Sequence, residues 1–176
     1  MTANLYQATV PQLTQILTAT LGNLDKAQGW ASENGLSEEE MLAKAIAPDM
    51  WPLGKQFQVV AAHSAGAVKG AIAGSFGPDL SEAPRDFASL RTLLTQALDF
   101  LGSVSPDEVN GAEDKDVVLE VRGKVMMRFK GADFLLSFAQ PNFYFHSMAA
   151  YAILRGLGVP VGKRDFLGPV RVQVPA

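Results

Sequence analysis

Apolar residues recur in alternating three- and four-residue steps after Asp86, and this periodicity constrains the fold more than any other feature of the chain. The stripe comprises Phe87, Leu90, Leu94, Ala97, Leu101 and Val104. Steps of three and four place side chains on one face of an α-helix. The pattern therefore predicts a helix over 87–104 with one buried face, and Asp86 is a suitable N-cap for it.

Three other long segments carry helix signals. The first runs from Thr9 to Ser32 with Pro11 near its start, although Leu5 and Tyr6 allow an upstream extension with a kink. The second spans 52–75, after prolines that break the chain. The third spans 141–157, because proline suits a first helical turn and the glycine at 158 suits a helix end. Four such helices predict a mainly α protein, a four-helix bundle.

Small residues recur every four positions in the second of these helices, at Ala62, Gly66, Gly70 and Gly74. Each interior glycine costs about 0.8–1.0 kcal/mol of helix propensity relative to alanine. Close approach of a neighbouring helix or of a second subunit would offset that cost. The alternative is a helix that frays near Gly74.

Shorter elements are expected between the helices. Ser37 to Glu40 has the pattern of a capping box and opens a short helix through Ala45. Two β-rich runs, 117–121 and 125–129, flank Arg122-Gly123-Lys124 and predict a small hairpin before the last helix. The acidic stretch 105–116 has the composition of a solvated loop, and 170–174 is compatible with an edge strand.

Size and composition exclude several classes of protein. The 176 residues suffice for a single domain, 1–176, with a core of its own. A net charge of -3 gives no basic footprint for nucleic acid, and no apolar run approaches the roughly 20 residues of a membrane span. Cysteine is absent, so the chain has no disulfide framework and no thiolate nucleophile. Without a signal-peptide pattern at its start, a cytoplasmic protein is expected.

Two histidines are present, His63 and His146. An all-histidine zinc site needs three, so we expect no metal site of that kind. His63, beside alanines and a serine, is expected to be a surface or partly buried helix residue without a function. His146 lies four residues after Asn142 on one helix face, among aromatic residues. It is either a core histidine with a satisfied ring or the floor of a pocket.

Five blocks of the sequence resemble an uncharacterised bacterial family of unknown function, which is itself similar to the DinB/YfiT-like superfamily of four-helix bundles. They are Leu5–Pro11 (LYQATVP), Ala47–Leu53 (APDMWPL), Pro141–His146 (PNFYFH), Ala150–Arg155 (AYAILR) and Gly162–Gly168 (GKRDFLG). The resemblance covers nearly the whole chain. It implies a DinB-like bundle, often dimeric, in which many members hold a divalent metal through three histidines and some are thiol-dependent transferases.

The resemblance carries over only in part. The histidine pair of the superfamily's last helix falls on Asn142 and His146, and its further histidine falls near Gln56 or Gln58. Amides are poor ligands for zinc or nickel. We therefore expect a degenerate site with no metal and no cofactor. If the second and last helices run in the same direction, as the superfamily implies, a ligand pocket forms at one bundle end. Its polar lining would be Asp49, Gln56, Asn142, Tyr144 and His146.

Three functional readings follow from these residues. The first is a bundle that binds a small ligand in the degenerate site, with no assigned catalytic residue. The second is a metal-dependent hydrolase or thiol-dependent transferase in which Asp49 and His146 hold the ion. The third is a structural or interaction protein without a ligand. A homodimer is expected in each case, from the glycine row and the superfamily's habit.

Overall fold

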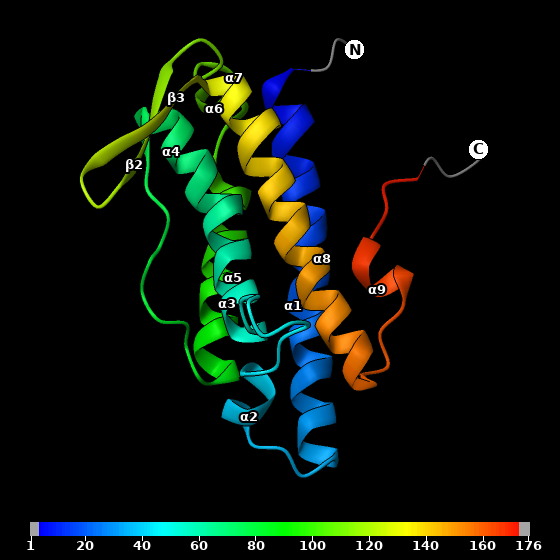
Figure 1. Ribbon diagram of the computed structural model, residues 1–176. Helices are drawn as coiled ribbons and strands as arrows, with labels where there is room; N and C mark the ends of the chain where they lie inside the picture. Colours follow the sequence, from blue (N-terminus) through cyan, green and yellow to red (C-terminus); the bar gives the residue numbers. More distant parts are fainter. Residues whose placement is uncertain (1–3, 173–176) are drawn as a thin grey trace.

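Four long helical rods pack side by side in the computed structural model, which describes residues 4–172 (Figure 1). They are α1 (Leu5–Glu33), α3 continued by α4 (Leu53–Ala61 and Ala67–Ala73), α5 (Phe87–Ser103) and α8 (Gln140–Leu157). The core lies between them and contains the predicted stripe on α5, from Phe87 to Leu101. The predicted mainly α bundle with a small hairpin is therefore confirmed.

Helix α1 begins at Leu5 and continues through Pro11, so the upstream extension is correct. The side chain of Asn4 caps this helix by accepting a hydrogen bond from the backbone N–H of Gln7 at 2.9 Å. The short helix α2 (Glu38–Leu42) follows, and the capping box between Ser37 and Glu40 is formed as predicted. It ends three residues before the expected Ala45.

The second rod contains a π-helical segment, Ala62–Gly66, between α3 and α4. Two glycines of this rod, Gly66 and Gly70, face the short strand β1 (Ser75–Phe76) of the same chain and not a neighbouring helix. A Cβ atom at Gly70 would lie 3.0 Å from both Phe76 Cβ and the Ser75 carbonyl oxygen. Gly74 ends α4 with a left-handed backbone, φ 84°. The chain therefore turns at Gly74, and β1 packs closely against the glycine row of the preceding helix.

After α5, the stretch predicted to be a solvated loop contains helix α6 (Pro106–Asn110). A second capping box forms it, because Ser105 accepts from the backbone N–H of Glu108 and the Glu108 carboxylate accepts from that of Ser105. Val109 is buried in the core. The acidic residues are exposed as expected, but the segment is anchored by its apolar positions.

The predicted hairpin is present as β2 (Asp116–Val121) and β3 (Lys124–Lys130), paired antiparallel. Arg122 and Gly123 form its two-residue turn with φ angles of 51° and 74°, the left-handed pair that matches strand twist. The sheet also contains β1, which pairs parallel with β2 through Ser75 and Val118. Among the described residues the sheet order is β1-β2-β3.

The last rod starts ten residues earlier than predicted. It runs from α7 (Gly131–Asp133) through a π-helical segment, Phe134–Ala139, into α8. Pro141 lies inside this continuous helix rather than at its start. A wider π-helical turn just before it relieves the clash that a proline ring makes with the preceding turn. Gly158 ends the helix at φ 94°, as expected.

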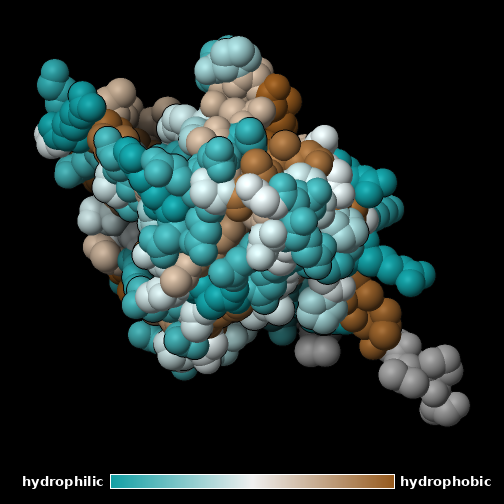
Figure 2. All heavy atoms as spheres, turned by 90° about the horizontal axis from the view of Figure 1, so that it is seen from below, coloured by the Kyte–Doolittle hydropathy of each residue, from teal (hydrophilic) through white to brown (hydrophobic). Residues whose placement is uncertain are grey.

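Helix α9 (Lys163–Leu167) packs against α1 near the chain end (Figure 1). Of the segment considered as an edge strand, residues 170–172 have no regular structure, and 173–174 lie outside the described residues. Within 4–172 no helix is both long and apolar enough to cross a membrane. Figure 2 views the bundle from the α2 end, where hydrophilic surface predominates and apolar atoms are confined to separate patches.

Helices α3 and α8 run in opposite directions. In Figure 1 the second rod rises from the α2 end toward the hairpin, whereas the last rod descends from the hairpin end toward α9. The side-chain contacts agree with this arrangement. Gln56, early in the second rod, contacts His146, whereas His63, two turns later, lies 5.7 Å from Phe138, which precedes His146 in the last rod. The expectation that these helices run in the same direction is wrong.

Candidate functional site

A buried hydrogen bond joins Gln56 of α3 to His146 of α8. The Gln56 Oε1 atom lies 2.7 Å from His146 Nδ1, and the two residues are 1% and 7% exposed. The Gln56 Nε2 group donates to the Trp51 carbonyl oxygen at 2.9 Å, which fixes the orientation of the amide. Oε1 can only accept, so Nδ1 of His146 carries the proton. In neutral His146 the lone pair is therefore on Nε2.

Aromatic rings surround His146. The indole of Trp51 is stacked on it with centroids 5.5 Å apart, and the ring of Phe145 meets it edge-on at 5.1 Å. The imidazole of His63 lies 6.0 Å away and nearly parallel. Burial lowers the pKa of His146 to about 4, because a charged imidazole would lose its hydration here. The ring is therefore neutral at pH 7.

His63 is the site residue that the sequence interpretation treated as a helix residue without a function. It is 7% exposed, and burial together with the nearby His146 lowers its pKa to about 4. Its buried Nδ1 has no hydrogen-bond partner among residues 4–172. One signal could have indicated it: seven residues separate it from Gln56, which places both on one face of a helix. Its neighbours Phe76 and Phe138 come from distant segments.

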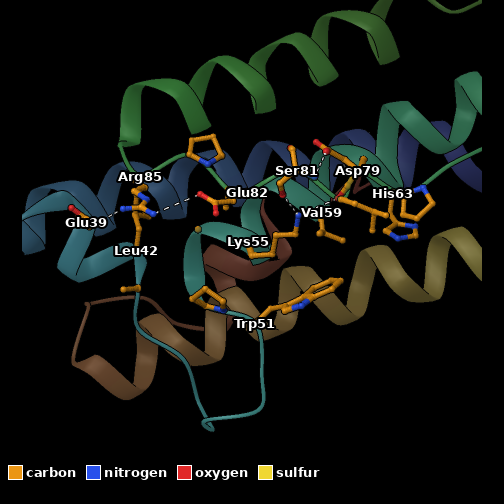
Figure 3. A pocket seen from close by; sticks show the side chains of 18 residues that line it. Glu39, Leu42, Trp51, Lys55, Val59, His63, Asp79, Ser81, Glu82 and Arg85 are labelled. Atoms are coloured by element: carbon orange, nitrogen blue, oxygen red, sulfur yellow. Dashed lines mark hydrogen bonds and ion pairs between the residues drawn. The ribbon is translucent and has the colours of Figure 1, made fainter. Parts of the chain in front are cut away.

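A cavity of about 590 Å³ borders this ring cluster (Figure 3). Trp51, Lys55 and His63 line one side of it, and residues 78–85 line the other. These come from the start of α3, the π-helical segment and the connection between β1 and α5. The cavity is at the Trp51 end of the second helix, close to the loop expected on one side of the pocket. The start of the last helix, expected on the other side, is near the hairpin instead (Figure 1). The far wall is formed by residues 78–85, for which no motif predicted this position.

Residues 78–85 are held to α3 by two polar side chains. Lys55 Nζ donates to three oxygens: Gln58 Oε1 at 2.8 Å, the Ser81 carbonyl at 2.8 Å and the Asp79 carbonyl at 3.1 Å. Gln58 Nε2 donates to Asp79 Oδ2 and to Ser81 Oγ. Hydrogen bonds from the side chain and backbone of Ser81, and from Gln58, lower the pKa of Asp79. At the other end Arg85 forms ion pairs with Glu39 and Glu82 (Figure 3).

None of the five residues expected in the pocket lines this cavity, and three of them lie away from the Gln56–His146 pair. Asp49 is exposed in the loop before Trp51. Asn142 donates from Nδ2 to the Phe138 carbonyl oxygen at 2.8 Å, one turn earlier in its own helix. Tyr144 is half-buried with its hydroxyl 3.5 Å from Gln140 Nε2, and burial raises its pKa. The structure therefore joins Gln56 to His146, and it separates the other three from that pair.

The side chains at the superfamily's metal positions do not fit a metal ion. Gln56 uses its Oε1 on His146 and its Nε2 on a carbonyl, and the Asn142 amide donates within its own helix. His146 is then the single imidazole at these positions. Across residues 4–172, no three His, Cys, Asp or Glu side chains form a group that could hold a metal ion.

The fold and this buried pair place the protein among DinB-like helical bundles. A crystal structure described as a DinB family member protein from Shewanella denitrificans is similar, with a TM-score of 0.80 and 29% sequence identity. The match covers 97% of this chain and 96% of that one. A model of a domain of unknown function, DUF1993, matches residues 5–167, so the chain belongs to the DUF1993 family. No curated protein matches the sequence.

Proposed function

We propose that this protein binds a small molecule in the cavity between α3 and residues 78–85, and that it does so without a metal. In this proposal the Gln56–His146 hydrogen bond takes the place of the metal ion implied by the superfamily. The pair fixes the His146 ring and, through the Trp51 carbonyl, the start of α3. No catalytic residue is assigned.

The observation that carries the proposal is His63 on the cavity wall. A buried nitrogen without a partner costs about 1–3 kcal/mol, which a protein core normally avoids. Here the ring of His63 borders a cavity of about 590 Å³, within the range of about 300–1,000 Å³ usual for small-ligand sites. Much of the remaining lining is apolar, with Leu42, Val59 and Leu80 among it. An apolar cavity with a few polar groups is the usual composition of such a site.

An NMR fragment screen tests ligand binding. The chain has two tryptophans, and Trp51 lines the cavity whereas Trp30 packs near Gly158 at the end of α8. Fragments that bind in the cavity should shift the indole N–H signal of Trp51 and the ring signals of His63, with the Trp30 signal unchanged as an internal control. A diverse library that shifts neither Trp51 nor His63 would refute the proposal.

Metal analysis tests the proposal that the protein functions without a bound metal. We expect no stoichiometric zinc, nickel or iron in protein purified without chelators, because one imidazole and two committed amides make a poor site. Near one equivalent of metal, lost in His146→Ala, would instead support a metal-dependent hydrolase or thiol-dependent transferase. The double variant Gln56→His with Asn142→His places histidine at all three positions that the resemblance implies, and it tests whether that set can hold a metal in this fold.

A further inference from the structure

We propose that the ligand of this cavity is an uncharged, largely apolar molecule with one hydroxyl or similar group that pairs with His63. The inference rests on the proposed function and specifies the chemical class of the ligand. In the bound state the imidazole of His63 turns about its Cβ–Cγ bond to present a nitrogen to that group. A hydroxyl suits either neutral tautomer, because it can both donate and accept.

The ammonium group of Lys55 on the cavity wall has no free hydrogen-bond donor. Lys55 has three ammonium hydrogens, and each is donated to an oxygen of Gln58, Asp79 or Ser81. An anionic ligand could recruit Lys55 only by breaking bonds that hold residues 78–85 in place. Lysine has no further donor to offer. Lys55 therefore holds residues 78–85 against α3 and does not act as an anion receptor.

Arg85 is paired with carboxylates, although its guanidinium is largely exposed and has further N–H donors. Its guanidinium lies 2.8 Å from Glu39 Oε1 and 3.6 Å from Glu82 Oε2. With Asp79, the wall carries three carboxylates against two cations, so its formal charge is -1 when His63 is neutral. A net negative wall disfavours an anion. An organic cation is attracted by these carboxylates, but it would lose its hydration if it were placed against the buried rings of the inner wall.

The inner wall also disfavours a charged ligand. His63 on this wall and the adjacent His146, which does not line the cavity, are buried and neutral at pH 7, since their pKa values are held near 4 by desolvation. The same desolvation would act on a charged ligand placed against the His63 ring. The Nδ1 atom of His63 is buried without a hydrogen-bond partner among residues 4–172, and rotation of the ring would bring it to the cavity. An uncharged ligand with a hydroxyl supplies this partner without burying a charge.

Three probes that share a naphthalene ring but differ in the charge of their substituent test the inference: 2-naphthol, 2-naphthoate and 2-naphthylmethylammonium. Their affinities are measured by isothermal titration calorimetry at pH 7.5 with the full chain, and the Trp51 indole signal locates each probe. We expect 2-naphthol to bind at least tenfold more tightly than either charged probe. In His63→Phe its affinity should fall about tenfold, while that of naphthalene should not change.

The outcomes separate the two proposals. If 2-naphthoate or the ammonium probe shifts Trp51 and binds as tightly as 2-naphthol, the cavity is a ligand site but the inference about charge is wrong. Equal loss of naphthalene and 2-naphthol affinity in His63→Phe would show that His63 shapes the cavity without pairing with the hydroxyl, which also overturns the inference. If no probe shifts Trp51, the proposed function itself fails, and this inference fails with it.

Discussion

At the scale of single residues, Gln56 connects the start of α3 to a ring on α8. Its amide links the carbonyl of Trp51 to the imidazole of His146, so one side chain fixes the start of α3 and a ring on α8. The bond also determines which nitrogen of His146 is protonated. Two substitutions of Gln56 test these two roles separately.

Gln56→Leu should lower the free energy of unfolding by about 1–3 kcal/mol, because it leaves the Nδ1–H of His146 and the Trp51 carbonyl without partners. Urea denaturation provides the measurement. The control is Gln96→Leu on the exposed face of α5, expected to change stability by less than about 0.5 kcal/mol. Equal stability of Gln56→Leu and the wild type would show that the hydrogen bond is energetically unimportant.

Gln56→Glu keeps the shape of the side chain and adds a negative charge beside His146. A neighbouring carboxylate favours the protonated imidazole, so the pKa of His146 should rise by at least one pH unit from about 4. NMR titration of the histidine ring signals measures the change. A pKa of His146 that stays near 4 would contradict the contact seen in the structure.

The two buried histidines make stability depend on pH. In the folded protein their pKa values are about 4, whereas an unfolded histidine titrates near 6.5. The unfolded chain therefore binds protons first as pH falls, and that favours unfolding. The stabilisation is complete above about pH 6.5 and is lost between about pH 6.5 and 4. The limiting slope is about 1.4 kcal/mol per pH unit for each histidine.

Urea denaturation at several values between pH 7 and 4.5 measures this dependence. His63→Phe should roughly halve the slope, because the chain contains only one other histidine. A wild-type stability that does not change across this range would show that the rings are protonated in the folded state. Carboxyl groups such as Asp79 contribute at lower pH, since their pKa values are lowered from 3.8.

The sequence indicated part of this site. Gln56 and His146 could be selected because they fall on positions where relatives carry histidines, and the structure brings them together. His63 could not be selected from its immediate neighbours, which are alanines and a serine. Its surroundings come from β1 and the last helix, and the sequence near His63 contains no information about those contacts. Asn142 was misplaced because the expected helix start at Pro141 is inside a longer helix.

At the scale of elements, the sequence predicted those helix ends that depend on neighbouring residues alone. The capping box at Ser37 and the left-handed glycine at 158 were read correctly, because each depends on local residues alone. The same box at Ser105 was missed because the acidic residues around it favoured a loop. Strand β1 has two residues and pairs with a strand about 40 residues away, so no local periodicity could reveal it.

Gly70→Ala tests the contact between α4 and β1. A methyl group there would lie 3.0 Å from Phe76 Cβ and from a backbone oxygen, so we expect a loss of about 1–3 kcal/mol in stability. The matched control is Gly22→Ala in α1, where nothing lies within 4 Å. It should stabilise by up to about 1 kcal/mol, because alanine is the better helix former. Thermal unfolding of both variants measures the difference, and similar midpoints would count against the contact.

At the scale of the whole molecule, the antiparallel arrangement of α3 and α8 determines which residues meet. In a parallel pair the first turns of both helices would lie together. In the antiparallel pair Gln56, at the start of one helix, reaches His146 inside the other. Helix periodicity predicts which face is buried but not the direction of the partner helix, and for that reason the bundle was predicted and the pocket wall was not.

A homodimer remains a prediction, and its original argument has changed. The glycine row was expected to receive a second subunit, but Gly66 and Gly70 are covered by Phe76 of the same chain. The expectation now rests on the superfamily's habit, and such a dimer should bury at least about 1,000 Å². Light scattering at tens of micromolar should give twice the chain mass of 18.8 kDa. A monomer mass at that concentration would decide against it.

The π-helical segment Ala62–Gly66 makes chain length, as well as residue identity, a determinant of the cavity. A π-helical turn contains one residue more than an α-helical turn. Deleting one residue between His63 and Gly70 while the π-helical turn persists would rotate the two positions relative to each other by about 100°. Either Gly70 would then turn away from Phe76, or His63 would turn away from the cavity wall. A relative one residue shorter here would keep both contacts only with a regular α-helix in place of the π-helical turn.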